Sequence, residues 1–212
     1  MTATQQRKAP QTPARTAISD RRSVLIFVVT LLVMLTADLL VKWLAFEHVA
    51  GQPVVLNGPA ASTRIHSHEG VMLVPKVLSL QLTLNEGAVF GLGEGGRWIF
   101  IAFSLVAAGV ICVIFARSAA GRIVLHLSLA AVLAGALGNL YDRLRFGVVR
   151  DMLHLFPDVH LPFGWRWPNG SSEVYPWIFN IADVCLVIGL LLLLVLLYRE
   201  DGGGRQGDKV TR

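Results

Sequence analysis

Four long apolar runs constrain the fold of this 212-residue chain more than any other feature. A helix needs roughly 20 mostly apolar residues to cross the hydrocarbon core of a bilayer. Four segments meet this requirement, at about 24–46, 98–115, 123–140 and 178–198. Charged residues make up only 16% of the chain, against about 25% in soluble domains, and most of them lie outside these runs. We therefore predict an all-α membrane protein with four transmembrane helices.

Basic residues at the ends of the runs predict the orientation, because lysine and arginine concentrate on the cytoplasmic side of a membrane. They gather in the terminal segments 1–22 and 200–212 and in the short turn between the second and third runs. Both termini are therefore expected in the cytoplasm, with outer loops at 47–97 and 141–177, although the second loop holds four arginines of its own. The terminal segments have little apolar surface, so we expect disordered tails around a membrane domain at 23–199.

The first outer loop contains a strand pattern. In residues 78–85, leucines alternate with polar residues, which is the period of a half-buried strand. Residues 71–74 and 53–56 are candidate partner strands. We therefore predict a small extracytoplasmic β-sheet that is formed by the first outer loop and lies on the outer membrane surface.

A few charges lie within the apolar runs or close to their ends. A charge at the centre of a span costs about 2.5–3.5 kcal/mol on insertion scales, so such residues are candidate functional groups. At 1.5 Å per residue, the first of these acids lies roughly 24 Å from the cytoplasmic edge. The directions of the third and fourth runs bring the other acids to the same outer edge. The set consists of Asp38, Lys42, Asp142, Arg143, Asp151 and Asp183.

Several of these side chains also have a purely structural interpretation. Asp38 and Lys42, four residues apart on one helix face, can form an ion pair that fixes the first helix. Asp142 can tie the second outer loop to the third helix, and Asp151 can be an ordinary surface acid. Asp183 is harder to explain in this way, because it lies among apolar residues, and a buried carboxylate without a cation raises its pKa or shares a proton.

Three kinds of function can be compared for a protein with acids at a membrane. Two carboxylates that share a proton are the working parts of an aspartic protease. Acids spread across the depth of the membrane would instead favour a proton- or ion-coupled transporter, and a noncatalytic scaffold would not need the pair at all. His154 could join the acids in a metal site, but a single histidine is a poor ligand set for zinc. The net charge of +5 comes mostly from tails and loops, so we expect no nucleic-acid partner.

Four motifs, in order along residues 24–198, resemble those of the bacterial lipoprotein signal peptidase family, signal peptidase II. Each is similar to a family pattern: Asp-x-x-x-Lys, Asn-x-Gly-x-Ala-Phe, Gly-Asn-x-x-Asp-Arg followed by Gly-x-Val-x-Asp-Phe, and Phe-Asn-x-Ala-Asp. The matching segments are Asp38-Leu-Leu-Val-Lys42, Asn85-Glu-Gly-Ala-Val-Phe90, Gly138-Asn-Leu-Tyr-Asp-Arg143 with Gly147-Val-Val-Arg-Asp151, and Phe179-Asn-Ile-Ala-Asp183.

The resemblance implies a metal-free, cofactor-free aspartic endopeptidase that cuts diacylglyceryl-modified prolipoproteins before the lipidated cysteine. It implies that Asp151 and Asp183 are the catalytic pair of an intramembrane peptidase domain at 23–199. Small residues such as Gly135 and Gly138 permit close helix approach and could leave room for a substrate helix, although plain packing explains them equally well. The residues with an implied substrate-binding or supporting role are Asn139, Arg143, Asn180, Asp142, Asn85, Asp38 and Lys42.

The expected setting is the bacterial cytoplasmic membrane, with the active site near the outer leaflet and the protein a monomer among membrane lipids. Val89 and Met152 stand where the family usually has alanine and phenylalanine. A larger departure is the stretch of 31 residues between Asp151 and Asp183, which looks long for the family. Its segment 155–177 is rich in aromatic residues and proline, and aromatic residues suit a membrane interface. We interpret this segment either as a lid over the active site or as a passive interfacial loop.

Overall fold

The four predicted spans form four long helices in the computed structural model, which describes residues 15–56, 65, 67–87 and 96–207. All four are long and apolar enough to cross a membrane, which confirms the predicted membrane fold. They are α1 (Arg21–His48), α2 (Arg97–Arg117), α3 (Ile123–Phe146) and α4 (Ile181–Gly207).

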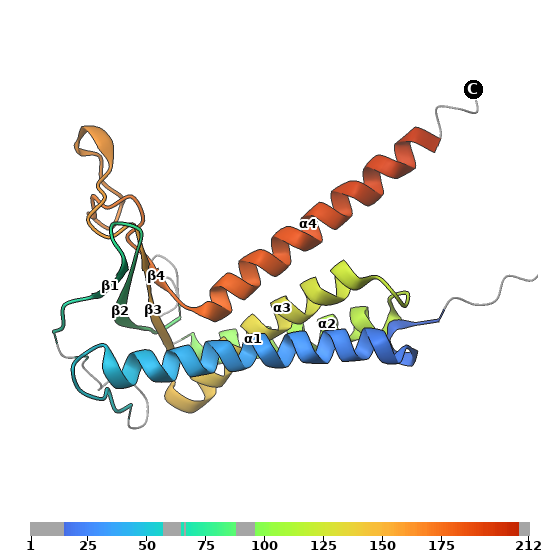
Figure 1. Cartoon of the computed structure of the whole chain (residues 1–212), viewed down its shortest axis with the longest axis horizontal. Coiled ribbons are helices and arrows are strands. Elements are labelled where there is room, and N and C mark those ends of the chain that lie inside the picture. The colour runs from blue at the N-terminus through green and yellow to red at the C-terminus, as the bar shows by residue number, and fades with distance from the viewer. Residues whose placement is uncertain (1–14, 57–64, 66, 88–95, 208–212) are drawn as a thin grey trace, which may run out of the picture.

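Helix α3 lies at the centre of the bundle and packs against each of the other three helices. Its approach to α4 depends on glycines, because a methyl group at Gly135 would collide with the carbonyl oxygen of Ala182, and one at Gly189 would lie 2.6 Å from Val132. Figure 1 shows α4 lying over α3 and leaning away from α1 toward its C-terminal end. The close α3–α4 contact therefore fixes the beginning of α4 against the bundle.

Parts of both terminal segments that were predicted to be disordered are ordered. Residues from Arg15 onward are folded: Ala17 is fully buried, and its N–H donates to the Ser118 carbonyl at 2.8 Å. The predicted disorder of 1–22 is therefore wrong for its last residues, and residues 1–14 lie outside the described part of the chain. At the other end α4 continues to Gly207, so the start of the predicted disordered tail is helical.

A four-stranded antiparallel sheet lies at one end of the bundle, in the order β1-β2-β3-β4. The predicted strands at 71–74 and 78–85 are confirmed, as β1 (Val71–Val74) and β2 (Leu78–Asn85). Strands β3 (Val149–Leu155) and β4 (Ile178–Phe179) come from the second outer loop, so the expectation that the first loop alone forms the sheet is wrong.

The sequence did not predict β3, and it wrongly predicted a strand at 53–56. Both differences have physical explanations. Six of the seven residues of β3 are buried, so its sequence lacks the polar–apolar alternation of a half-exposed strand. The segment 53–56 forms no strand. Instead the N–H of Val54 donates to the Phe46 carbonyl at 2.9 Å, and Leu56 packs into the core beneath the sheet. This segment therefore closes the end of α1 and does not extend the sheet.

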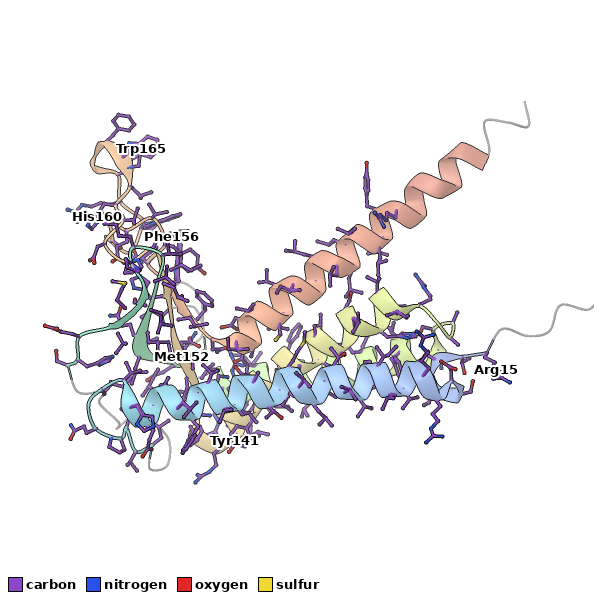
Figure 2. The ribbon with its side chains drawn as sticks, in the orientation of Figure 1. Arg15, Tyr141, Met152, Phe156, His160 and Trp165 are labelled. Atoms are coloured by element: carbon purple, nitrogen blue, oxygen red, sulfur yellow. The ribbon has the colours of Figure 1, made fainter. Side chains whose placement is uncertain are left out.

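The sheet is joined directly to the helices that carry the predicted acids. Helix α3 runs to Phe146, past its predicted end, and stops at Gly147, whose φ of 85° is left-handed. Strand β3 begins two residues later, and Met152 on it is fully buried in the core between sheet and α1, where Figure 2 labels it. Because β4 leads straight into α4, the sheet holds the start of that helix as well.

We predict that Gly135→Ala destabilises the protein by about 1–3 kcal/mol, because the new methyl group must push α3 and α4 apart. Gly109 in α2 has nothing within 4 Å of the position that an added methyl group would take, so Gly109→Ala is the matched control. We expect the control to leave stability unchanged or to raise it by up to about 1 kcal/mol. The free energy of unfolding in mixed micelles measures both, and equal effects would contradict the proposed role of the α3–α4 contact.

Candidate active site

A fully buried lysine ties α1 to α3. The Lys42 ammonium lies 2.9 Å from the Asp38 carboxylate and 3.1 Å from that of Asp142. It also donates to the side-chain oxygen of Asn139 at 3.2 Å. An ammonium has three N–H donors, so these three acceptors satisfy it. The i,i+4 pair predicted in the first span is thus an ion pair, and it extends across the bundle to α3.

Asp142 connects this lysine to the sheet through Arg150. The guanidinium of Arg150 donates to one Asp142 oxygen at 2.8 and 3.1 Å, and its backbone N–H donates to the other at 3.0 Å. The same guanidinium lies 4.5 Å from the centre of the Phe146 ring. Arg150 was not among the residues predicted for the site. It lies one residue before Asp151 on a strand, so the two side chains point to opposite faces.

Asp38 reaches from α1 to the first turn of α4. Its second oxygen accepts the backbone N–H of Ala182 at 2.8 Å. The first N–H groups of a helix have no partner within the helix, and a carboxylate there also interacts favourably with the helix dipole. Gly138 makes room for this contact, since a methyl group there would collide with the Asp38 carboxylate. Asp38 therefore positions the beginning of α4.

Asn180 and Asp183 form a capping box at the start of α4. The Asn180 side-chain oxygen accepts the N–H of Asp183 at 3.0 Å, and the Asp183 carboxylate accepts the N–H of Asn180 at 3.1 Å. This reciprocal pattern satisfies two backbone donors at a helix start. The fourth predicted span therefore begins at Ile181, three residues later than expected, because Ile178 and Phe179 pair with β3.

Asp151 and Asp183 both accept hydrogen bonds from side-chain amides of asparagines. The amide nitrogen of Asn180 donates to Asp151 at 2.6 Å, and that of Asn85 donates to its other oxygen at 3.1 Å. The amide nitrogen of Asn139 donates to Asp183 at 2.9 Å. Each of the two carboxylates thus accepts a hydrogen bond from Asn180: Asp151 from its side-chain amide and Asp183 from its backbone N–H.

Burial, and after it the nearby charge of Asp183, raises the pKa of Asp151 from 3.8 to about 7. Hydrogen bonds from Asn85 and Asn180 favour the ionised form and act the other way. A carboxyl group that titrates near neutral pH beside a second carboxylate is suited to general acid–base chemistry.

The remaining predicted residues lie around this centre. Arg143 is half-buried, with its guanidinium 4.9 Å from the centre of the Phe100 ring. The N–H of Gly87 donates to the Asn85 side-chain oxygen at 3.0 Å, which fixes the orientation of that amide. The rest of this motif, 88–90, lies outside the described residues. His154, considered above as a metal ligand, is paired with Glu173 at 3.3 Å.

The fold and this site together define a membrane protein built around a cluster of buried acids at one end of four helices. Two solved structures described as bacterial membrane enzymes share the fold. One has a TM-score of 0.60 at 23% identity and covers 91% of this chain and 96% of its own. The other has a TM-score of 0.57 at 24% identity, with coverages of 88% and 97%.

The particular family follows from the sequence comparisons. The family model for Signal peptidase (SPase) II matches residues 30–199, and the chain belongs to this family. The lipoprotein signal peptidase of Desulfitobacterium hafniense (strain DSM 10664 / DCB-2) is 37% identical over 141 residues, covering 66% of this chain and 82% of that one. The lipoprotein signal peptidase of Symbiobacterium thermophilum is 30% identical over 179 residues, covering 82% and 96%. The resemblance inferred from four motifs is thereby confirmed.

We predict that Lys42→Met destabilises the protein by about 3–5 kcal/mol, because it leaves buried carboxylates without their cation. The exposed Lys76, in the turn between β1 and β2, provides the control Lys76→Met, which should change little. The double variant Asp38→Asn/Lys42→Met should lose less than Lys42→Met alone, since Asp142 keeps its contact with Arg150. Unfolding in mixed micelles measures all three. A Lys42 variant as stable as the Lys76 variant would contradict the role of the buried lysine.

Proposed function

We propose that this protein is an intramembrane aspartic endopeptidase that removes signal peptides from diacylglyceryl-modified prolipoproteins by cutting before the lipidated cysteine. The observation that carries the proposal is the arrangement of Asp151 and Asp183 around Asn180, with the pKa of Asp151 at about 7. Membership of the signal peptidase II family and the names of the relatives support the choice of substrate.

The proposed mechanism gives the two acids different protonation states. Asp151, which has the raised pKa, carries the proton and passes it to the scissile carbonyl oxygen as the water adds to the carbonyl carbon. Asp183, ionised, accepts a proton from the attacking water, whose oxygen bonds to the carbonyl carbon. When the C–N bond breaks, that proton passes to the leaving amine and Asp151 recovers its own. The reaction consumes one water and leaves both acids as they began.

The surrounding residues hold this pair and the substrate. Asn139 and Asn180 orient the two carboxylates through their amides. Asn85 and Arg143 are the proposed substrate contacts, from the sheet and from the end of α3. The supporting ion pairs act at a distance by fixing α1, α3 and α4. We propose that the protein works as a monomer among membrane lipids, with both termini in the cytoplasm and the site near the outer leaflet.

A proton- or ion-coupled transporter is the alternative function, and the placement of the acids argues against it. A proton path would need ionisable groups through the depth of the membrane. Between Arg97 and Arg117 helix α2 contains no acid, and between Ile181 and Arg199 helix α4 contains only Asp183. The acids of α1 and α3 lie toward the sheet as well, so no chain of carboxylates crosses the bundle.

We predict that Asp151→Asn and Asp183→Asn each abolish cleavage of a diacylated prolipoprotein by the purified protein in detergent. An amide can neither accept the proton from water nor return one. Asp158→Asn is the matched control: Asp158 is an exposed acid of the same loop with a left-handed φ of 62°, a conformation that asparagine tolerates. It should retain full activity. Cleavage by either dyad variant, with unfolding behaviour like that of the parent, would refute the assignment.

The raised pKa of Asp151 predicts how activity depends on pH. Below about pH 7 Asp151 keeps its proton, and above it both acids are ionised, so the carbonyl loses its donor. Cleavage should therefore fall as the pH rises through about 7. Asn85→Ala removes a hydrogen bond that favours the ionised form and should move this fall to higher pH. The measurement is kcat against pH for both proteins. An unshifted or flat profile would contradict the prediction.

A further inference from the structure

An ordered hairpin, here called the arm (residues 159–174), projects from the sheet between β3 and β4. Its two sides are joined by backbone hydrogen bonds: the N–H of Val174 donates to Val159 and that of Leu161 donates to Ser172, both at 2.7 Å. The indole N–H of Trp167 donates to the Glu173 carbonyl at 2.8 Å. The arm is thus held together by its own contacts, in the segment interpreted above as a lid or an interfacial loop.

The end of the arm presents aromatic side chains that have no protein surface to cover. Phe163 is 91% exposed and Trp165 is 67% exposed. Phe163 also has a left-handed φ of 61°, which is uncommon and costly for a bulky residue. Large aromatic groups held outward in this way are suited to an apolar environment outside the molecule.

The direction of the arm points to that environment. Figures 1 and 2 show it leaving the end of the bundle that carries the sheet, across the long direction of α1 and toward the side on which α4 lies. Because α1 crosses the membrane, a segment that runs across its direction at this end lies along the membrane surface. The labelled Trp165 lies at the far end of the arm, well away from α1.

The chemistry of the arm matches a phospholipid interface. Tryptophan is enriched at the headgroup level of membranes, and arginine pairs well with phosphate. Arg166 is exposed and is the only lysine or arginine of the arm, whose one acid, Glu173, pairs with His154. With Leu161, Trp165 and Trp167 it lines an open hollow of about 460 Å³, so a cation and an apolar wall lie side by side.

We propose that the arm docks into the lipid interface of the leaflet nearest the sheet, with Phe163 and Trp165 inserted below the headgroups and Arg166 beside a lipid phosphate. The proposal goes beyond the proteolytic function and does not depend on it. It assigns the exposed aromatic residues a lipid environment, and it makes the arm an additional attachment of the protein to the membrane surface.

Such docking would fix the height of the candidate active site above the lipid. Aromatic contacts run from the arm to the start of α4: Trp167 to Trp177 at 4.8 Å, Trp177 to Tyr175 at 5.3 Å, and Tyr175 to Phe179 at 5.9 Å between ring centres. Phe179 precedes Asn180, the residue that contacts both carboxylates. An arm held in the interface therefore resists movement of Asn180 along the membrane normal.

The test places a fluorescent label on the arm of the full chain. Cys112 and Cys185 are replaced by alanine, Phe163→Cys is labelled with bimane, and the protein is reconstituted in vesicles of phosphatidylethanolamine and phosphatidylglycerol. Lipids brominated on their acyl chains report insertion, and aqueous iodide reports exposure to water. We expect bromolipids to quench the label about twofold or more and iodide to quench it weakly, as for a group in the interface.

Variants of the neighbouring side chains test which groups hold the arm in the lipid. Trp165→Ser should lower quenching by bromolipid, while the conservative Trp165→Phe should keep it. Arg166→Gln should lower quenching most in vesicles rich in phosphatidylglycerol, whose headgroup is anionic. A label open to iodide and insensitive to bromolipid would overturn the proposal. A label shielded from both quenchers would also overturn it, since the end of the arm would then be covered by protein.

Discussion

The burial of Lys42 is the interaction on which the other contacts of this structure depend. Lys42 is fully buried, so its charge must find its partners within the protein. Lys42 meets Asp38 and Asp142, and each acid extends the connection further. Asp38 continues to the backbone of α4, and Asp142 continues through Arg150 to β3. One ammonium group thereby fixes the relative positions of three helices and the sheet.

The two kinds of acid in this protein have different partners. Asp38 and Asp142 take the cations, whereas Asp151 and Asp183 receive hydrogen bonds from the amides of Asn85, Asn139 and Asn180. Burial is the largest cause of the raised pKa of Asp151, and the hydrogen bonds from the neutral amides of Asn85 and Asn180 oppose it only in part. A rigid ionic framework can therefore lie beside a carboxyl group that titrates near neutral pH. The proposed catalytic acids are held in place without being locked in the ionised form.

The sequence predicted the helices and the meeting of the acids, because both depend on where apolar runs begin and end. The prediction failed where the partner of a residue lies in a segment whose structure the sequence pattern does not indicate. The sequence does not assign Arg150 a role, because its contact with Asp142 requires β3 to pack against α3. The late start of α4 was missed because the pairing of β4 overrides the apolar pattern. The arm shows the same limit: its aromatic composition was visible, but its hairpin was not.

Charge balance around the site supports one shared proton in the proposed catalytic pair. Arg143 interacts electrostatically with Asp183, Asp151 and Asp142, and it joins Lys42 and Arg150 as the third cation of the cluster. Asp38, Asp142 and one ionised member of the pair supply three negative charges. A second ionised carboxylate would leave the cluster with a net negative charge in a medium of low dielectric, where like charges repel strongly. The framework that positions the two acids therefore also favours the singly protonated state that the proposed mechanism requires.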